Sequence, residues 1–139
     1  MPDAPATLTL HLSADPYQGP PIADVAVDGI ALESVAVLAV HGKATHPMVI
    51  RTTYGPHAVA VTFANDAWGG TADTDRNLFV DGMDLDGVPL PGTAGALYSN
   101  GTLTFALDLK PTRAGLLARH ADALADAGAL AALLAVTDA

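Results

Sequence analysis

The chain has 139 residues, of which half are hydrophobic and only 5% aromatic, and it contains no cysteine. This length is usual for one domain, and such a composition can bury a core of valine, leucine and alanine. Fifteen acidic residues against six lysines and arginines give a formal charge of −9, which argues against nucleic acid and anionic membranes as partners. The absence of thiols excludes disulfides, thiolate metal sites and cysteine nucleophiles.

Short strands separated by turn residues dominate the first hundred residues. The alternation of leucine with threonine and histidine at 8–12 predicts the first strand. Residues 15–21 form a loop, because three prolines and a glycine forbid a strand ladder there. Alternating or β-branched runs predict the later strands, in chain order, at 25–27, 32–40, 48–53, 57–63, 77–85 and 103–107.

About eight short strands joined by Gly, Pro and Asp turns indicate an all-β fold, an antiparallel β-sandwich or jelly roll. The tail differs, because it is mostly alanine and leucine and begins with the helix-start residues Pro111 and Thr112. We therefore expect a β-sandwich module over residues 1–109 and a helical C-terminal extension over 110–139. Three interpretations of that extension stay open: it packs on its own sandwich, it binds a partner or forms a homo-oligomer, or it is a partly disordered linker.

The segment 65–81 carries the most informative chemistry of the chain. It holds the only tryptophan, Trp68, two adjacent glycines and four of the fifteen acids, between two predicted strands. Oxygen donors crowded onto one loop suit a hard cation such as calcium. An exposed tryptophan beside such a cation would suit the face of a sugar ring, so the loop favours a binding module.

Other kinds of site fit the sequence less well. The spacing Asp73-x-Asp75-x-Asn77 resembles the start of an EF-hand loop, but Leu78 stands where that loop needs glycine. The five histidines are scattered without zinc spacing, and we expect surface or capping roles for them. No Gly-x-Ser-x-Gly elbow is present and there is a single glutamate, so we expect no catalysis. The acids at 81, 84 and 86 are expected to form a solvated face.

Four stretches resemble, in order, the calcium-dependent xylan-binding carbohydrate-binding modules, families 60 and 36. They are Asp15-Pro-Tyr-Gln-Gly, Val25-Ala-Val-Asp-Gly, Gly55-Pro-His-Ala-Val-Ala-Val-Thr-Phe, and Asn65-Asp66 followed by Asp75-Arg-Asn-Leu-Phe-Val-Asp. The resemblance covers roughly residues 6–108. It implies a β-sandwich in which loop carboxylates and a backbone carbonyl hold Ca²⁺. Two adjacent sugar hydroxyls would complete the coordination, which makes a polysaccharide, a β-glycan such as xylan, the expected partner.

The resemblance also assigns roles to individual residues. Asp66 and Asp75 are the first-choice calcium ligands, and Asp73 and Asn77 rank second. Arg76 is expected to anchor the loop through hydrogen bonds to carboxylate or backbone. The candidate ligand-binding residues, with the two aromatic rings first, are Trp68, Tyr17, Gln18 and Asp15.

One departure from the family pattern weakens part of this expectation. The early loop of the family carries further acids, and this chain has Ala14, Pro16, Pro20 and Pro21 in their place. Any metal site that uses those acids is weakened or missing here. A second hypothesis, of a different class, is a structural or protein-interaction domain, in which calcium only orders the loop and the C-terminal helix docks a partner. We expect an extracellular or cell-surface location, although the start Met1-Pro2-Asp3 shows no secretory signal.

Overall fold

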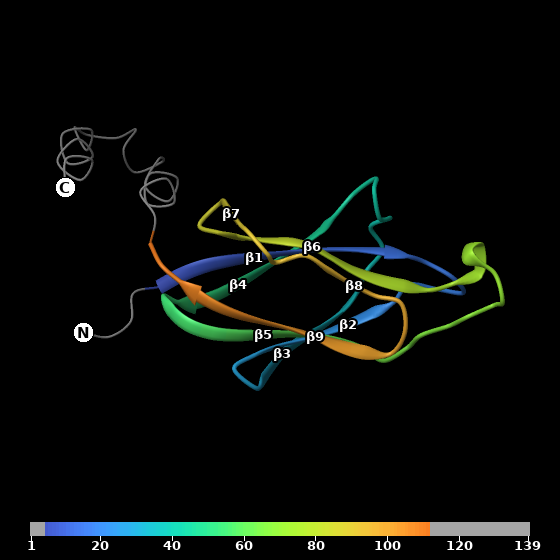
Figure 1. The fold of residues 1–139 in the computed structure, drawn as a ribbon, viewed down its shortest axis with the longest axis horizontal. Helices are drawn as coiled ribbons and strands as arrows, with labels where there is room; N and C mark the ends of the chain where they lie inside the picture. The colour runs from blue at the N-terminus through green and yellow to red at the C-terminus, as the bar shows by residue number, and fades with distance from the viewer. Residues whose placement is uncertain (1–4, 112–139) are drawn as a thin grey trace.

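The computed structural model describes residues 5–111; the remaining residues, 1–4 and 112–139, are outside the described part. Residues 5–111 form nine strands and one short 3₁₀ helix, η1 (Ala72–Thr74). The strands make two antiparallel sheets that lie face to face (Figure 1). This confirms the predicted β-sandwich. The predicted helical extension at 110–139 falls almost entirely outside the described residues, and the division of the chain at residue 109 stays a prediction.

Sheet A has the strand order β4-β1-β6-β7, and β8 also pairs with β6. Its strands are β1 (Pro5–Asp15), β4 (His46–Thr53), β6 (Asn77–Leu85), β7 (Val88–Leu90) and β8 (Gly95–Leu97). Sheet B has the order β3-β2-β5-β9. Its strands are β2 (Ile22–Val27), β3 (Ile30–Ala36), β5 (Gly55–Phe63) and β9 (Gly101–Leu109).

The core between the sheets follows from the alternation of side chains along the strands. Leu8, Leu10 and Leu12 of β1 are at most 1% exposed, and Val59 and Val61 of β5 are fully buried opposite them. Each such side chain contributes about 1.5–3 kcal/mol when it leaves water. The faces that the alternation predicts for these two strands are confirmed.

The predicted strand 32–40 is too long. Strand β3 ends at Ala36, and the chain then crosses from sheet B to the end of β1. There the Ala14 amide donates to the Ala39 carbonyl at 2.8 Å, and the His41 amide donates to the Ala14 carbonyl at 2.9 Å. An apolar run does not show where a strand changes sheets. Val35 and Val37 are buried on either side of the end of β3, whereas Leu38 and Val40 are exposed although they belong to the same apolar run.

The acid at 86 is not part of a solvated face. Asp86 is 6% exposed, and its carboxylate accepts hydrogen bonds from the Thr7 amide at 3.0 Å and from the Tyr54 hydroxyl. These bonds offset the cost of burying a polar group. In the described part of the chain, no helix has the length and apolar character that a membrane crossing requires.

Candidate functional site

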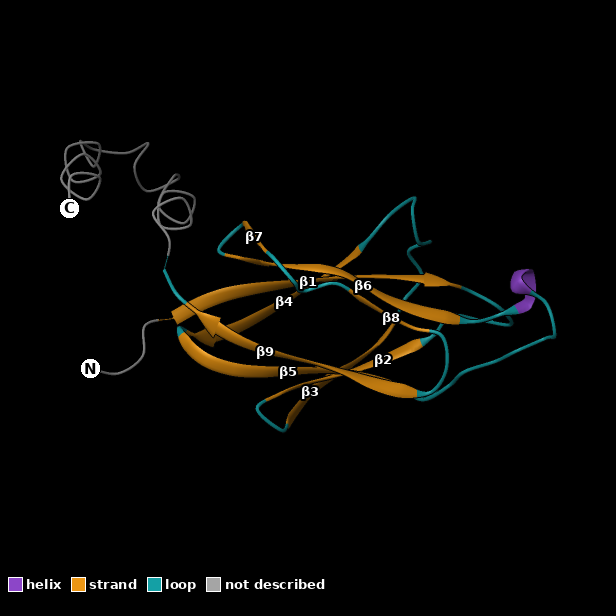
Figure 2. Cartoon of the chain, viewed as in Figure 1, coloured by secondary structure: helices purple, strands orange, loops and turns teal. Residues whose placement is uncertain are grey.

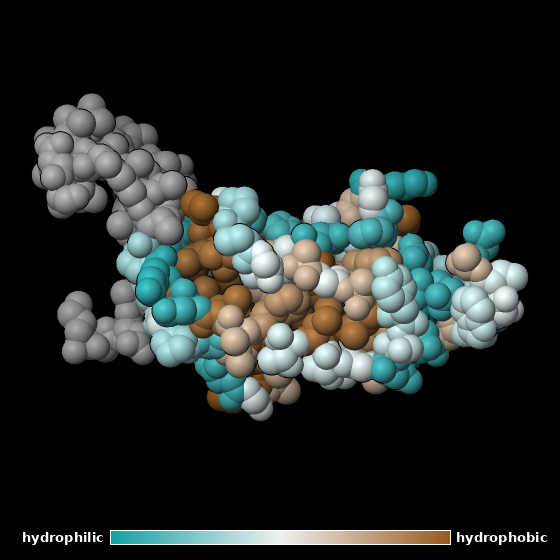
Figure 3. Space-filling model, in the orientation of Figure 1, coloured by the Kyte–Doolittle hydropathy of each residue, from teal (hydrophilic) through white to brown (hydrophobic). Residues whose placement is uncertain are grey.

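Two loops meet at one end of the sandwich: the loop after β1, around residues 15–21, and the loop after β5, residues 64–76. Figure 2 shows this end as the tip that carries η1, and Figure 3 shows that its surface is coloured hydrophilic or neutral. The apolar colours gather instead along the middle of the face in view. The tip is therefore a polar loop assembly on an apolar sandwich.

Arg76 holds the two loops together. Its Nε donates to the carbonyls of Tyr17 at 3.0 Å and Gly19 at 3.2 Å. Its terminal nitrogens donate to the carbonyl of Gln18 at 2.8 Å and to the carbonyl of Asn65. The rigid fork of five donors makes arginine suited to such a clamp. The predicted anchoring role of Arg76 is confirmed, with backbone carbonyls as its partners.

Asn65 and Gly69 tighten the same junction. The Asn65 side chain accepts from the Ile22 amide at 2.8 Å and donates to the Pro20 carbonyl at 3.2 Å. A Cβ added at Gly69 would lie 2.6 Å from the Tyr17 hydroxyl oxygen, so a larger residue would push Tyr17 away. The loop after β1 is thus fixed against the loop after β5 by both hydrogen bonds and close packing.

The loop after β5 closes on itself through a short antiparallel ladder. Trp68 and Asp75 form an isolated bridge, and the Arg76 amide donates to the Ala67 carbonyl at 2.8 Å. Asn77, two residues beyond Asp75, is the first residue of β6. Within sheet A it pairs with Asp15 at the end of β1.

Asp66 and Asn77 each bury a side-chain oxygen that has no hydrogen-bond partner, Asp66 Oδ1 and Asn77 Oδ1. The other end of the Asn77 amide is occupied, because Nδ2 donates to Asp15 Oδ2 at 3.1 Å. A buried acceptor without a donor costs about 1–3 kcal/mol. Asp66 lies in the loop after β5 and Asn77 begins β6, so two such oxygens flank the same loop, and hydrogen bonds within the protein do not account for them.

Comparison with known proteins gives these oxygens a context. The family model of the Ca-dependent, xylan-binding carbohydrate-binding module CBM60 matches residues 7–100. The chain belongs to the CBM60 family. Its sandwich is similar to the structure of vCBM60 in complex with galactobiose, with a TM-score of 0.52 and 17% identity over 73% of this chain and 99% of that chain. At this identity the likeness shows the shared fold.

A second similar structure is the selenomethionine form of vCBM60, described with a circular permutation that links two families of calcium-dependent carbohydrate-binding modules. It has a TM-score of 0.49 and 18% identity over 72% of this chain and 89% of that chain. A search of curated proteins gave no match.

The CBM60 family depends on calcium, and the donors at the tip fit that ion. Carboxylate and amide oxygens are both usual calcium ligands, and calcium accepts six to eight oxygens in a flexible geometry. Asp66 Oδ1 and Asn77 Oδ1 are such oxygens, and both lack a donor. Within residues 5–111, no three acidic or histidine side chains gather into a metal site by themselves.

The other predicted site residues of this CBM60 chain lie around the same tip. Asp75 is half-buried opposite Trp68, and Trp68 is 61% exposed. Asp73 is exposed on η1, and Gln18 is exposed in the left-handed region at φ 53°. Asp73 thus presents its carboxylate to solvent, whereas Asp66 and Asp75 are both half-buried and Asn77 is buried.

One residue of the site was missed by sequence reasoning. Asn100 lies in the turn before β9, and its Oδ1 accepts from the Asp66 amide at 2.8 Å. This bond fixes the backbone of Asp66 from sheet B. The only signal in the sequence is the Ser99-Asn100-Gly101 turn, which by itself predicts no role at a site 34 residues away along the chain.

Two further groups of polar side chains lie outside the tip. Ser13 Oγ lies 2.9 Å from His41 Nδ1, and Asp81 lies 3.3 Å from the same nitrogen. A catalytic triad needs serine and acid on opposite ring nitrogens, so these three residues form no proton relay.

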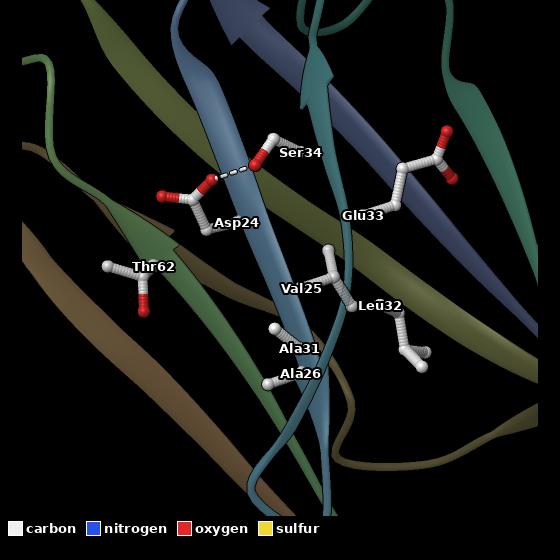
Figure 4. Close-up of a pocket in the computed structure, with 8 residues that line it drawn as sticks. All are labelled: Asp24, Val25, Ala26, Ala31, Leu32, Glu33, Ser34 and Thr62. Carbon is white, nitrogen blue, oxygen red and sulfur yellow. Dashed lines mark hydrogen bonds between the residues drawn. The ribbon is translucent and has the colours of Figure 1, made fainter.

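A shallow hollow of about 350 Å³ lies on the outer face of sheet B (Figure 4), where Ser34 donates to Asp24. Its remaining lining is largely small side chains, and the Thr62 hydroxyl bonds Thr102.

Proposed function

We propose that this CBM60 module is non-catalytic and binds a β-glycan, such as xylan, through a calcium ion held by Asp66 and Asn77. The observation that carries the proposal is the pair of buried oxygens, Asp66 Oδ1 and Asn77 Oδ1, that have no hydrogen-bond partner. The family match supports calcium as the cation and carbohydrate as the ligand.

When bound, calcium supplies coordination positions at which two adjacent sugar hydroxyls replace water. The chain itself orients the ligands for that ion. Asp15 fixes the Asn77 amide by accepting its Nδ2 at 3.1 Å, which leaves Oδ1 free for the cation. Asn100 fixes the backbone of Asp66. The Arg76 clamp holds both loops in place before the ligand arrives, which lowers the entropic cost of binding.

Trp68 and Asp75 are the proposed direct contacts to sugar. The indole of Trp68 is 61% exposed, and an aromatic face left in water suits the apolar C–H face of a sugar ring. Asp75 lies opposite Trp68 in the ladder, where its carboxylate can accept a hydrogen bond from a hydroxyl. Tyr17 stands over Gly69 and borders the same surface, while Asp73 and Gln18 lie at its exposed edge.

The proposed ligand is a class of glycan and not xylan alone. The family model is described as xylan-binding, while the similar vCBM60 structure contains galactobiose. Both sugars offer adjacent hydroxyls, and recognition through one diol tolerates changes elsewhere in the sugar. We also propose an extracellular or cell-surface setting, where polysaccharide is available and where modules with calcium affinities of roughly 10⁻⁴–10⁻³ M are loaded.

Affinity gel electrophoresis tests the proposal. The protein is run through gels with and without soluble xylan or galactan, in calcium or in EDTA. We expect retardation in calcium, and its loss in EDTA or in Asp66→Ala and Asn77→Ala. Asp108→Ala, which removes an exposed carboxylate on β9, is the matched control and should be retarded like the wild type. Retardation that survives both EDTA and Asp66→Ala would show that the calcium mechanism is wrong.

A further inference from the structure

The outer face of sheet A continues directly from the calcium loop. Leu78 and Val80 of β6 point into the core, so Asn77 and Phe79 point outward on the same face. The pairing of β1 with β6 shifts between His11 and Leu12, whose partners are Gly82 and Val80. Asp81 is therefore the extra residue of a bulge, and bulges commonly redirect a side chain next to a functional site.

Three rings gather on this face and form what we term the aromatic group: His41, Phe79 and Tyr98. The His41 ring stacks on Phe79 with centroids 3.8 Å apart and planes 13° apart. Tyr98 meets Phe79 edge-on, with centroids 5.8 Å apart. Phe79 is thereby covered, while Tyr98 stays 64% exposed. A large aromatic side chain held in place but left in water is typical of a contact surface.

A hollow adjoins the aromatic group. It has a volume of about 430 Å³ and is lined by His41, Gly42, Lys43, Ala44, Thr45 and Asp81. The lining combines an ammonium, a hydroxyl and a carboxylate with the edge of an aromatic group. Rings that accept C–H faces, next to a few donors and acceptors, are what a neutral polyhydroxylated ligand needs. Lys43 is the one lysine or arginine in this lining, and the protein carries a formal charge of −9, so a polyanionic ligand is disfavoured.

We propose that this face, from Phe79 to Asp81 with the aromatic group and its hollow, is a second glycan subsite. The subsite would receive further sugar residues of the glycan whose diol is held at the calcium loop, so this inference rests on the proposed function. The path from Asn77 to Asp81 spans four residues of β6, about 13 Å at the rise of a strand. A bound glycan therefore extends along the outer face of sheet A, and recognition depends on chain length.

Calorimetry with oligosaccharides of two and six sugars tests this subsite. The probes are β-1,4-linked xylo- and galacto-oligosaccharides in calcium, with wild type, Tyr98→Ala and Tyr98→Phe. We expect Tyr98→Ala to weaken hexasaccharide binding about tenfold, which corresponds to about 1.4 kcal/mol, without changing disaccharide binding. Tyr98→Phe, which keeps the ring, should retain most of the affinity. The matched control is Ile30→Ala, which truncates a 67% exposed side chain on β3 and should bind both probes normally.

The outcomes separate this inference from the function on which it rests. If EDTA abolishes binding but Tyr98→Ala leaves the hexasaccharide affinity unchanged, or weakens both lengths equally, the subsite is wrong and the calcium mechanism stands. If wild type binds none of the probes in calcium, the proposed function falls and the subsite falls with it. A thermal unfolding scan of Tyr98→Ala that matches the wild type assigns a selective loss to the contact.

Discussion

Replacement of Arg76 by alanine should disassemble the binding tip. The guanidinium donates to four backbone carbonyls, those of residues 17, 18, 19 and 65. A hydrogen bond to a charged group contributes about 1.5–3 kcal/mol net. Because one nitrogen serves two of the carbonyls and Arg76 is half-buried, we count fewer than three full bonds. Taken as about two full bonds, the contacts predict that the free energy of unfolding falls by about 3–6 kcal/mol.

Chemical denaturation monitored by circular dichroism measures this loss, and calorimetry measures glycan affinity in calcium. The free energy of unfolding and the glycan affinity of Arg76→Lys should lie between those of the wild type and Arg76→Ala, because an ammonium cannot reproduce the planar fork. Arg51→Ala, which truncates an exposed arginine on β4, is the matched control. An unchanged free energy of unfolding together with unchanged glycan affinity in Arg76→Ala would refute the clamp.

Three further changes have outcomes that follow from the structure. Gly69→Ala places a Cβ 2.6 Å from Thr74 and Tyr17, whereas in the control Gly101→Ala the nearest atom is 3.6 Å from the added Cβ. Measured by urea denaturation, the free energy of unfolding of Gly69→Ala should fall by about 1–3 kcal/mol. An equal loss in Gly101→Ala would contradict the close packing at Gly69. Asp86→Ala leaves the Thr7 amide without its side-chain acceptor and should lower the free energy of unfolding by about 1–3 kcal/mol. A urea unfolding midpoint equal to that of the wild type would contradict this role of Asp86. The hydrogen bond from His57, followed by that from the Ala58 amide, lowers the pKa of Asp28. The ionised Asp28 carboxylate then contributes to stability above its unfolded pKa near 3.9, and this contribution is lost as pH falls through the lowered pKa of the folded state. The difference in free energy of unfolding between wild type and Asp28→Asn should therefore narrow over that acid range. A difference that does not change with pH would contradict this assignment.

The strands were predictable where one face is buried and the other is not. The alternation at 57–63 matches β5 because every second side chain meets the core. The three-residue strands β7 and β8 leave too short a pattern to detect. Asp86 was wrongly expected in solvent because its partners, Thr7 and Tyr54, are distant in sequence. Burial set by long-range contacts is not encoded in a local pattern.

At the site, the anchoring role of Arg76 was predicted from the sequence and is confirmed, whereas the choice of the segment 65–81 as the binding loop stays a prediction. The family resemblance ranked Asn77 below Asp75 as a calcium ligand. The structure shows the reason to raise Asn77: its oxygen is buried without a partner, as is that of Asp66. The aromatic group could not be anticipated, because His41, Phe79 and Tyr98 come from three separate segments that only the fold brings together.

A calorimetric titration of calcium into metal-free protein shows directly whether Asp66 and Asn77 hold the metal. The wild type should bind Ca²⁺ with measurable heat, and the double variant Asp66→Ala/Asn77→Ala should lose that binding while keeping the wild-type far-UV circular dichroism spectrum. Unchanged calcium affinity in the folded double variant would contradict the claim that these two buried oxygens hold the metal.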